Sequence, residues 1–170
     1  LLLVGVIAAI WIMASSILSP FMHLKKHSNL RTYPRAALGM CLAHFGVGVF
    51  TLGVVIVSSF SIESDRPLRV NDTSNLAGFE FKLKGLESVK GPNYNATEGI
   101  IDVRRNGQFV VQLRPQKRTY LVQESPMTEA SIDAGWNRDI FVALGDPLGS
   151  DVWSVRLQYK PLIRFIWVGA

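Results

Sequence analysis

The sequence contains only one cysteine, Cys41, among its 170 residues. A single thiol excludes an internal disulfide and any metal site built from several cysteines. The run Leu1–Pro20 contains no ionisable side chain. A cleavable signal peptide would open with basic residues, but here Lys25 and Lys26 follow the apolar run. With no initiator methionine and an apolar run at each end, the chain is expected to be a fragment of a longer membrane protein.

Apolar residues make up 48% of the chain and are concentrated in three runs. Residues 1–20 and 36–59 are each predicted to be a transmembrane helix, because about 20 apolar residues span the bilayer core. The third run, residues 161–170, is predicted to begin a further transmembrane helix. Pro161 suits the first turn of a helix, and Arg164 and Trp167 suit a membrane interface.

The basic residues indicate how these helices are oriented. Residues 21–35 contain a cluster of Lys and Arg and are predicted to form a cytoplasmic loop, since positive charge is retained on that side. Residues 60–160 then lie across the membrane, which in a bacterium is the periplasm. The loop accounts for much of the net charge of +5. We therefore expect a lipid membrane as a partner and no nucleic acid.

Between the apolar runs the pattern changes to that of strands. Phe79, Phe81 and Leu83 alternate with charged residues, as in a half-buried strand. Asn106 and Gly107 separate two further alternating segments, which is a strong hairpin signal. Additional strands are predicted at residues 119–123, 138–144 and 152–159. Residues 125–134 look least like a strand and are predicted to form a short helix capped by Ser125 or Thr128.

The predicted fold class is an α+β membrane protein fragment. Transmembrane α-helices flank an antiparallel β-rich periplasmic domain, either a sandwich or a small barrel. About a hundred residues are available to this domain, which suffices for one modest core.

His44 is the main candidate for a functional residue. It lies about nine residues into the second apolar run, well below the interface at about 1.5 Å per residue. An ionisable group inside a span is costly and is by default a functional hypothesis. A neutral imidazole beside Gly46 and Gly48 suits axial ligation of a haem, because missing side chains leave space for the macrocycle.

A packing role for the same residues remains open. His44 could bond a carbonyl on a neighbouring helix while glycines allow close helix approach. Gly39, Gly46 and Gly53 recur every seven residues, as a packing seam would. These residues alone do not decide between the two interpretations.

Other polar clusters have ordinary structural interpretations. His23 and His27 are four residues apart, a spacing that can chelate a metal, but no nearby Asp, Glu or Cys completes a site. In the outer domain, the carboxylates near residues 124–139 fit surface ion pairs better than acid–base catalysis. The basic residues Arg114, Lys117 and Arg118 could contact an acidic partner or haem propionates, or lie at a solvated strand end. No catalytic residue is assigned.

Several motifs in this order resemble the C-terminal part of the CcmF family, the membrane component of the bacterial cytochrome c haem lyase. The resemblance covers nearly the whole chain. The motifs are Gly39–Val47, Gly91–Tyr94, Leu113–Tyr120, Ser125–Asp133, Arg138–Gly145 and Lys160–Arg164.

This resemblance implies a function in the bacterial inner membrane. Members of the family receive haem from a periplasmic haem chaperone and help attach it to apocytochrome c. The attachment forms thioethers between the haem vinyls and a Cys-x-x-Cys-His motif. A membrane haem b is expected to supply an electron that keeps the transferred haem reduced, with His44 as one axial ligand. Other haem lyase subunits, either thioredoxin-like or apocytochrome-binding, are implied as partners.

Two other functions remain as alternatives. The chain could belong to a non-catalytic scaffold that docks apocytochrome and chaperone through the β-rich domain. It could also belong to a haem transporter, although the two uncharged runs offer no continuous polar path.

Overall fold

The computed structural model describes residues 2–27, 32–122, 125–149 and 151–170. They form two compact units. A helical unit comprises the described residues of 1–61 together with residues 136–138 and 161–170. A β unit comprises the described residues of 62–135 and 139–160. Each unit is described separately.

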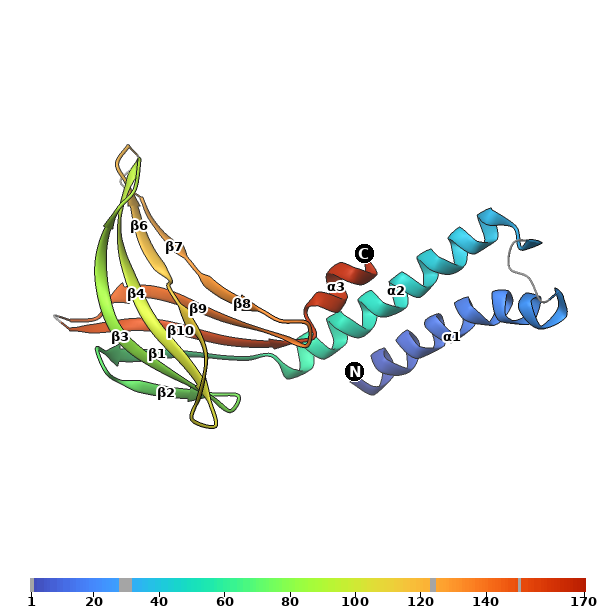
Figure 1. Ribbon diagram of the computed structural model, residues 1–170, viewed down its shortest axis with the longest axis horizontal. Helices are drawn as coiled ribbons and strands as arrows, with labels where there is room; N and C mark the ends of the chain where they lie inside the picture. Colours follow the sequence, from blue (N-terminus) through green and yellow to red (C-terminus); the bar gives the residue numbers. More distant parts are fainter. Residues whose placement is uncertain (1, 28–31, 123–124, 150) are drawn as a thin grey trace. The chain divides into compact units, whose positions relative to one another are not determined.

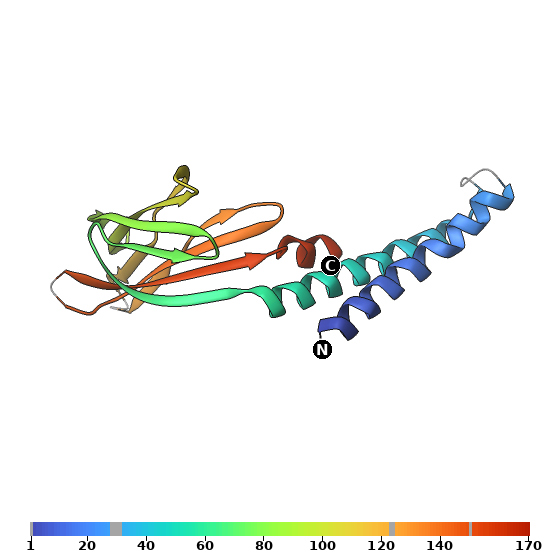
Figure 2. The same ribbon diagram turned by 90° about the horizontal axis from the view of Figure 1, so that it is seen from below.

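The helical unit contains α1 (Leu2–His27), α2 (Arg35–Phe60) and the short α3 (Arg164–Gly169). α1 and α2 lie side by side and run in opposite directions, and α3 lies beside α2 (Figures 1 and 2). The segments Leu2–Lys26 and Arg35–Phe60 are each long and apolar enough to cross a membrane. The two apolar helices thus form where the sequence predicts them.

α1 extends past the end of the first apolar run. Pro20 lies inside the helix, although it cannot donate a backbone hydrogen bond. The following residues include Met22, Leu24, Lys25 and Lys26, all of which favour helix. The helix therefore continues to His27, and the connection to α2 is shorter than the loop predicted for residues 21–35.

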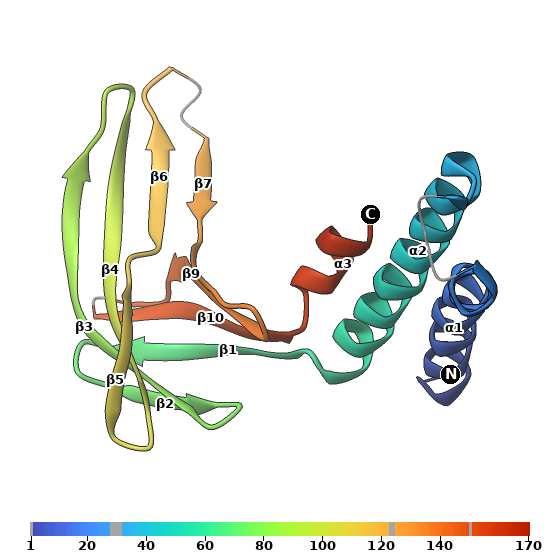
Figure 3. The ribbon, with the colours of Figure 1, turned by 45° about the vertical axis from the view of Figure 1, so that its right-hand side comes forward.

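The described residues of the β unit form ten strands, and the pairings β1–β10, β2–β3, β3–β4, β4–β5, β4–β6, β6–β7 and β8–β9 are antiparallel. One sheet has the strand order β1-β10-β9-β8, and the other has the order β2-β3-β4-β6-β7 with β5 paired to β4 (Figure 3). The strand bounds are β1 Ile62–Arg69, β2 Thr73–Leu76, β3 Phe79–Lys90, β4 Tyr94–Arg105, β5 Gln108–Leu113, β6 Gln116–Tyr120, β7 Pro126–Glu129, β8 Ser131–Ala134, β9 Arg138–Pro147 and β10 Val152–Pro161.

Both sheets contribute to a single apolar core. Alternate residues of β3, Phe79, Phe81 and Leu83, are buried, as the period-two pattern predicts. They belong to the same cluster as Ile140 and Leu157 of the other sheet. Two sheets packed through their apolar faces make a sandwich, so the predicted antiparallel β-rich domain is confirmed, and of the two predicted forms, sandwich or small barrel, it is a sandwich.

The hairpin predicted at Asn106 and Gly107 joins β4 to β5. Both residues have positive φ, 52° and 77°. This is the backbone of a type I′ turn, which matches the twist of antiparallel strands. Asn and Gly adopt it with the least steric cost, so the local sequence sets this connection.

The short helix predicted for residues 125–134 is wrong. Pro126–Glu129 and Ser131–Ala134 are strands that pair with β6 and β9 respectively. All four residues of β7 are exposed, so burial gives no alternation that could reveal the strand. Pairing with a neighbour, rather than intrinsic propensity, decides its conformation.

Candidate functional site

His44 lies on an exposed face of α2. Its Nδ1 is 2.8 Å from the carbonyl oxygen of Met40, four residues earlier in the same helix. Because a carbonyl only accepts hydrogen bonds, Nδ1 carries the proton in this contact. In the neutral imidazole, Nε2 is then the nitrogen with a free lone pair.

The other imidazole nitrogen has no hydrogen-bond partner among the residues that the structure describes. Nearby, Thr51 Oγ1 donates to the carbonyl of Val47 at 2.8 Å, so this hydroxyl is also satisfied within the helix. In the described residues, His44 bonds a carbonyl of its own helix and not one of a neighbouring helix. The ring instead has one nitrogen anchored to its own helix and the other available.

Glycines of α2 lie where other helices approach. A Cβ placed at Gly48 would be 2.5 Å from Met13 Cγ and 3.1 Å from the Ala9 carbonyl oxygen. One placed at Gly46 would be 2.9 Å from the Gly169 carbonyl oxygen. Gly48 thus faces α1, and Gly46 faces α3. Both glycines have packing contacts of their own, and their role in making room for a macrocycle stays a prediction.

The predicted seam of glycines is present in two of its three positions. Gly53, like Gly46, meets α3, because a Cβ placed at Gly53 would be 3.0 Å from Phe165 Cβ. A Cβ placed at Gly39 would have no such neighbour within 4 Å. Gly39 lines an apolar groove of about 890 Å³ together with Gly46, Phe50 and the end of α3. His44 is not among the residues that line this groove.

The remaining histidines do not form a metal site in the described residues. His23 Nε2 is 2.9 Å from Thr32 Oγ1, and its ring packs edge-on against Tyr33 with the centroids 5.0 Å apart. The side chain of His27 lies outside the described part of the chain. Among the residues described, no group of three or more His, Cys, Asp or Glu could hold a metal ion.

The basic cluster of the β unit is engaged in ion pairs. Arg114 Nη1 is 2.8 Å from Glu98 Oε1, and Lys117 Nζ is 2.9 Å from Asp146 Oδ1. Arg118 lies 4.5 Å above the ring of Tyr94. Each of the three basic residues thus has an interaction within the β unit.

Sequence reasoning missed the residue at the centre of this network. Glu98 is 8% exposed, and Gln116 Nε2 donates to its second carboxylate oxygen at 2.6 Å. Gln116 in turn accepts from Arg118 at 2.8 Å. The partners come from segments that pair only in the folded sheet, so no local sequence signal identifies the network. Of the carboxylates that the sequence analysis did consider, Glu129 pairs with Arg118 at 3.4 Å, and residue 124 lies outside the described residues.

A second charged pair lies on the exposed face of the other sheet. Arg156 Nε and Nη2 donate to the two carboxylate oxygens of Asp65 at 2.8 and 2.9 Å. This bidentate bond holds the pKa of Asp65 below its usual value, and the same bond raises the pKa of Arg156. Asp65, Arg156, Lys117 and Asp146 border a polar groove of about 400 Å³.

The comparison with protein families decides the classification. A family model described as "CcmF C-terminal beta-sandwich" matches residues 59–161. The chain belongs to the CcmF family.

Curated relatives agree with this membership. The cytochrome c-type biogenesis protein CcmF of Pseudomonas fluorescens is 42% identical over 164 residues, which is 95% of this chain and 25% of that protein. CcmF of Escherichia coli K12 is 37% identical over 131 residues, or 77% of this chain and 20% of that protein. The chain thus spans about a quarter of the length of the curated relatives it matches or less.

A solved structure described as cytochrome c haem lyase CcmF has the same fold. It superimposes with a TM-score of 0.74 over 97% of this chain and 28% of that chain, at 18% sequence identity. The likeness extends beyond the sandwich, because the aligned region includes nearly all of the helical unit as well.

Proposed function

We propose that the full-length protein is a membrane subunit of the cytochrome c haem lyase, and that this chain contributes one axial ligand of a haem b. Membership of the CcmF family supports a role in cytochrome c biogenesis. Within that role, the protein takes haem from a haem chaperone and helps attach it to apocytochrome c. The attachment joins the haem vinyls to the cysteines of the apocytochrome as thioethers.

The geometry of His44 carries the ligand proposal. Haem iron is commonly bound by an imidazole nitrogen, and ligating histidines typically donate their other N–H to a carbonyl or carboxylate. The 2.8 Å contact between Nδ1 and the Met40 carbonyl is such a bond. His44 is also exposed, so a bound group could reach Nε2. The residues present therefore fit one axial ligand of a haem.

The chain's own residues would act by positioning the imidazole. α2 is a continuous helix, which fixes the backbone on both sides of His44. The Met40 carbonyl restrains rotation of the ring and, by accepting the hydrogen bond from Nδ1–H, makes Nε2 a better electron donor. A bound haem b would supply the electron that keeps the transferred haem reduced. The second ligand belongs to the remaining part of the full-length protein in this proposal.

Placement in the bacterial inner membrane completes the proposal. The helices α1 and α2 cross the bilayer, and the basic connection between them faces the cytoplasm. The β unit then lies in the periplasm, where it can meet the haem chaperone, apocytochrome c and other lyase subunits. Support comes from the two candidate spans and from the Lys and Arg residues between them.

An oxidised-minus-reduced absorption spectrum of the purified full-length protein tests this function. The wild type should give a low-spin b-type spectrum, and His44→Ala should lose it while still inserting into the membrane. His23→Ala is the matched control, because it removes an imidazole that contacts Thr32 and Tyr33 instead. Identical spectra in all three proteins would refute the ligand assignment. A haem-free wild type that still binds apocytochrome would favour a scaffold.

A further inference from the structure

The turn between β8 and β9 belongs to the helical unit. Residues 136–138 cluster with the helices, whereas β8 and the rest of β9 after Arg138 cluster with the sandwich. Two contacts within the helical unit hold this turn. The backbone N–H of Leu162 donates to the carbonyl of Asn137 at 2.9 Å, and the rings of Trp136 and Phe165 lie 6.1 Å apart. The turn is therefore attached to the start of α3.

The backbone at this attachment has an uncommon conformation. Leu162 has a φ of 50°, in the left-handed region that bulky side chains rarely occupy. Its N–H is bonded to Asn137, and its carbonyl accepts from the N–H of Phe165 at 3.0 Å. These two bonds hold the chain where it changes from strand β10 to helix α3. The turn and the helix start thus form one local structure.

Contacts with α2 show how far from the end of that helix the turn and the start of α3 lie. Phe165 and Ile166 pack against Gly53, which lies two turns before Phe60, the last residue of α2. At about 1.5 Å per residue, this level is about 10 Å below the helix end. The 26 residues of α2 extend about 39 Å, and a bilayer is about 40–45 Å thick including its headgroup regions. With α2 centred in the bilayer, this level is about 8 Å from the midplane, and the hydrocarbon core ends at about 15 Å. The Trp136 ring, 6.1 Å from the Phe165 ring, can therefore reach the outer part of the acyl region next to the headgroups.

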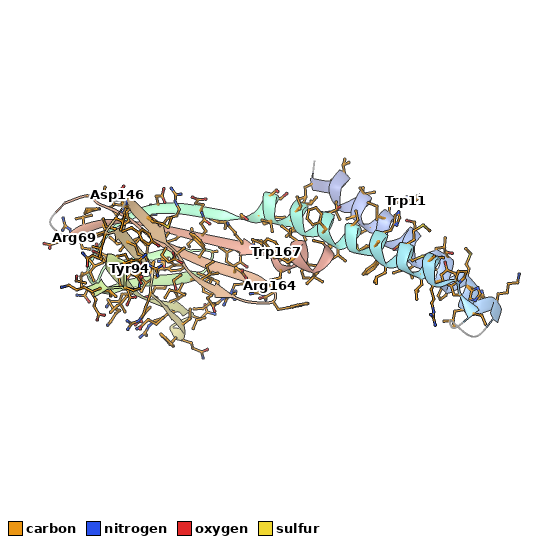
Figure 4. All side chains as sticks on the ribbon, turned by 90° about the horizontal axis from the view of Figure 1, so that it is seen from above. Trp11, Arg69, Tyr94, Asp146, Arg164 and Trp167 are labelled. Atoms are coloured by element: carbon orange, nitrogen blue, oxygen red, sulfur yellow. The ribbon has the colours of Figure 1, made fainter. Side chains whose placement is uncertain are left out.

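One tryptophan of the turn and one of α3 are exposed. Trp136 is 70% exposed and Trp167 is 76% exposed. Arg164, at the start of α3, is exposed as well, and Figure 4 shows Arg164 and Trp167 on this helix. Indole has an apolar body and one N–H donor, which is why Trp concentrates where lipid meets water. Arg is similarly suited to a helix end at the interface.

We propose that the β8–β9 turn is a membrane anchor in which the Trp136 indole occupies the lipid headgroup–acyl boundary. The partner is the phospholipid bilayer itself, contacted by an apolar ring with its N–H toward the headgroups. The proposal rests on the membrane placement in the proposed function and does not depend on haem. The anchor gives a role to residues 136–138. In sequence they lie between two strands of the proposed periplasmic unit, but they cluster with the helices.

Quenching of tryptophan fluorescence by brominated lipids tests the anchor. The full-length protein is reconstituted in nanodiscs of ordinary phospholipid or of phospholipid brominated near the headgroup end of its acyl chains. Wild type minus Trp136→Phe isolates the emission of Trp136. Trp153→Phe is the matched control, because Trp153 packs against the core of the sandwich.

The anchor predicts that brominated lipid removes most of the Trp136 emission and leaves the Trp153 emission unchanged. Equal Trp136 emission in the two lipids would overturn the proposal. This holds whether the emission wavelength indicates that the indole is covered by protein or exposed to water. The redox difference spectrum of the same samples separates this result from the proposed function. Trp136→Phe should retain the haem signal, so loss of quenching and loss of haem are independent outcomes.

Discussion

Replacing Arg114 with Met removes the only guanidinium paired with the buried carboxylate of Glu98 in the described residues. The Glu98 side chain is 11% exposed and Arg114 is 50% exposed, with 2.8 Å between Nη1 and Oε1. Removing one partner of a fully buried pair costs about 3–5 kcal/mol. Glu98 keeps the bond from Gln116 at 2.6 Å, and Arg114 is partly solvated already. The expected loss is therefore smaller, about 1–3 kcal/mol, in the range of a hydrogen bond to a charged group.

Thermal unfolding of the β unit within the purified chain, followed by its β-sheet circular dichroism, measures this loss. For a unit of this size, about 4–8 °C of midpoint shift corresponds to 1 kcal/mol. Arg156→Met is the matched control, because Arg156 and Asp65 are both about half exposed, at 50% and 51%. Exposed pairs contribute little, so this variant should shift the midpoint less. A larger shift in Arg156→Met than in Arg114→Met would refute the reasoning. Glu98→Gln should restore part of the stability of Arg114→Met.

The other two predictions concern the helices. Gly46→Leu should weaken the packing of α3, since a Cβ there would already lie 2.9 Å from the Gly169 carbonyl oxygen. Overpacking of this kind costs about 1–3 kcal/mol. Gly39→Leu should be tolerated, because a Cβ placed at Gly39 would have no neighbour within 4 Å. Unfolding of the two variants in detergent compares their stabilities. A reporter fused after Asn106 in the full-length protein should be active outside the cytoplasm, and one fused at Lys25 inside it. The reverse activities would contradict the orientation.

Much of the fold follows from the sequence because local pattern and final burial agree. The run around Phe81 alternates, and its apolar residues are buried. Asn106 and Gly107 impose a turn that only a few residue types adopt easily. The apolar runs of α1 and α2 lack charge over the length of a bilayer crossing. In each case the information lies within a few neighbouring residues.

The rest of the fold depends on pairing between distant segments. β1 has one buried residue, Leu68, in eight, so its strand conformation follows from its pairing with β10. Its Pro67 is tolerated because β1 is an edge strand. The helix predicted over β7 and β8 was wrong for the same reason, since only β6 and β9 give these strands their conformation.

The sequence selects His44 as the candidate residue, whose role as a ligand stays a prediction, and it does not give the geometry around His44. The sequence identifies His44 as an ionisable group inside an apolar run. It cannot say that Nδ1 bonds Met40 or that the ring is exposed, because both depend on rotamer and on which helices cover which face. Nor could it place Trp136 beside Phe165, because these residues are brought together by the return of β10 to the helices.

Restoration of haem ligation by free imidazole tests the central claim most directly. His44→Gly in the full-length protein removes the proposed ligand and leaves space for imidazole to take its place. The account predicts that the variant loses the low-spin b-type difference spectrum and regains it when imidazole is added. A variant that keeps the wild-type spectrum without imidazole would contradict the assignment of His44 as an axial ligand.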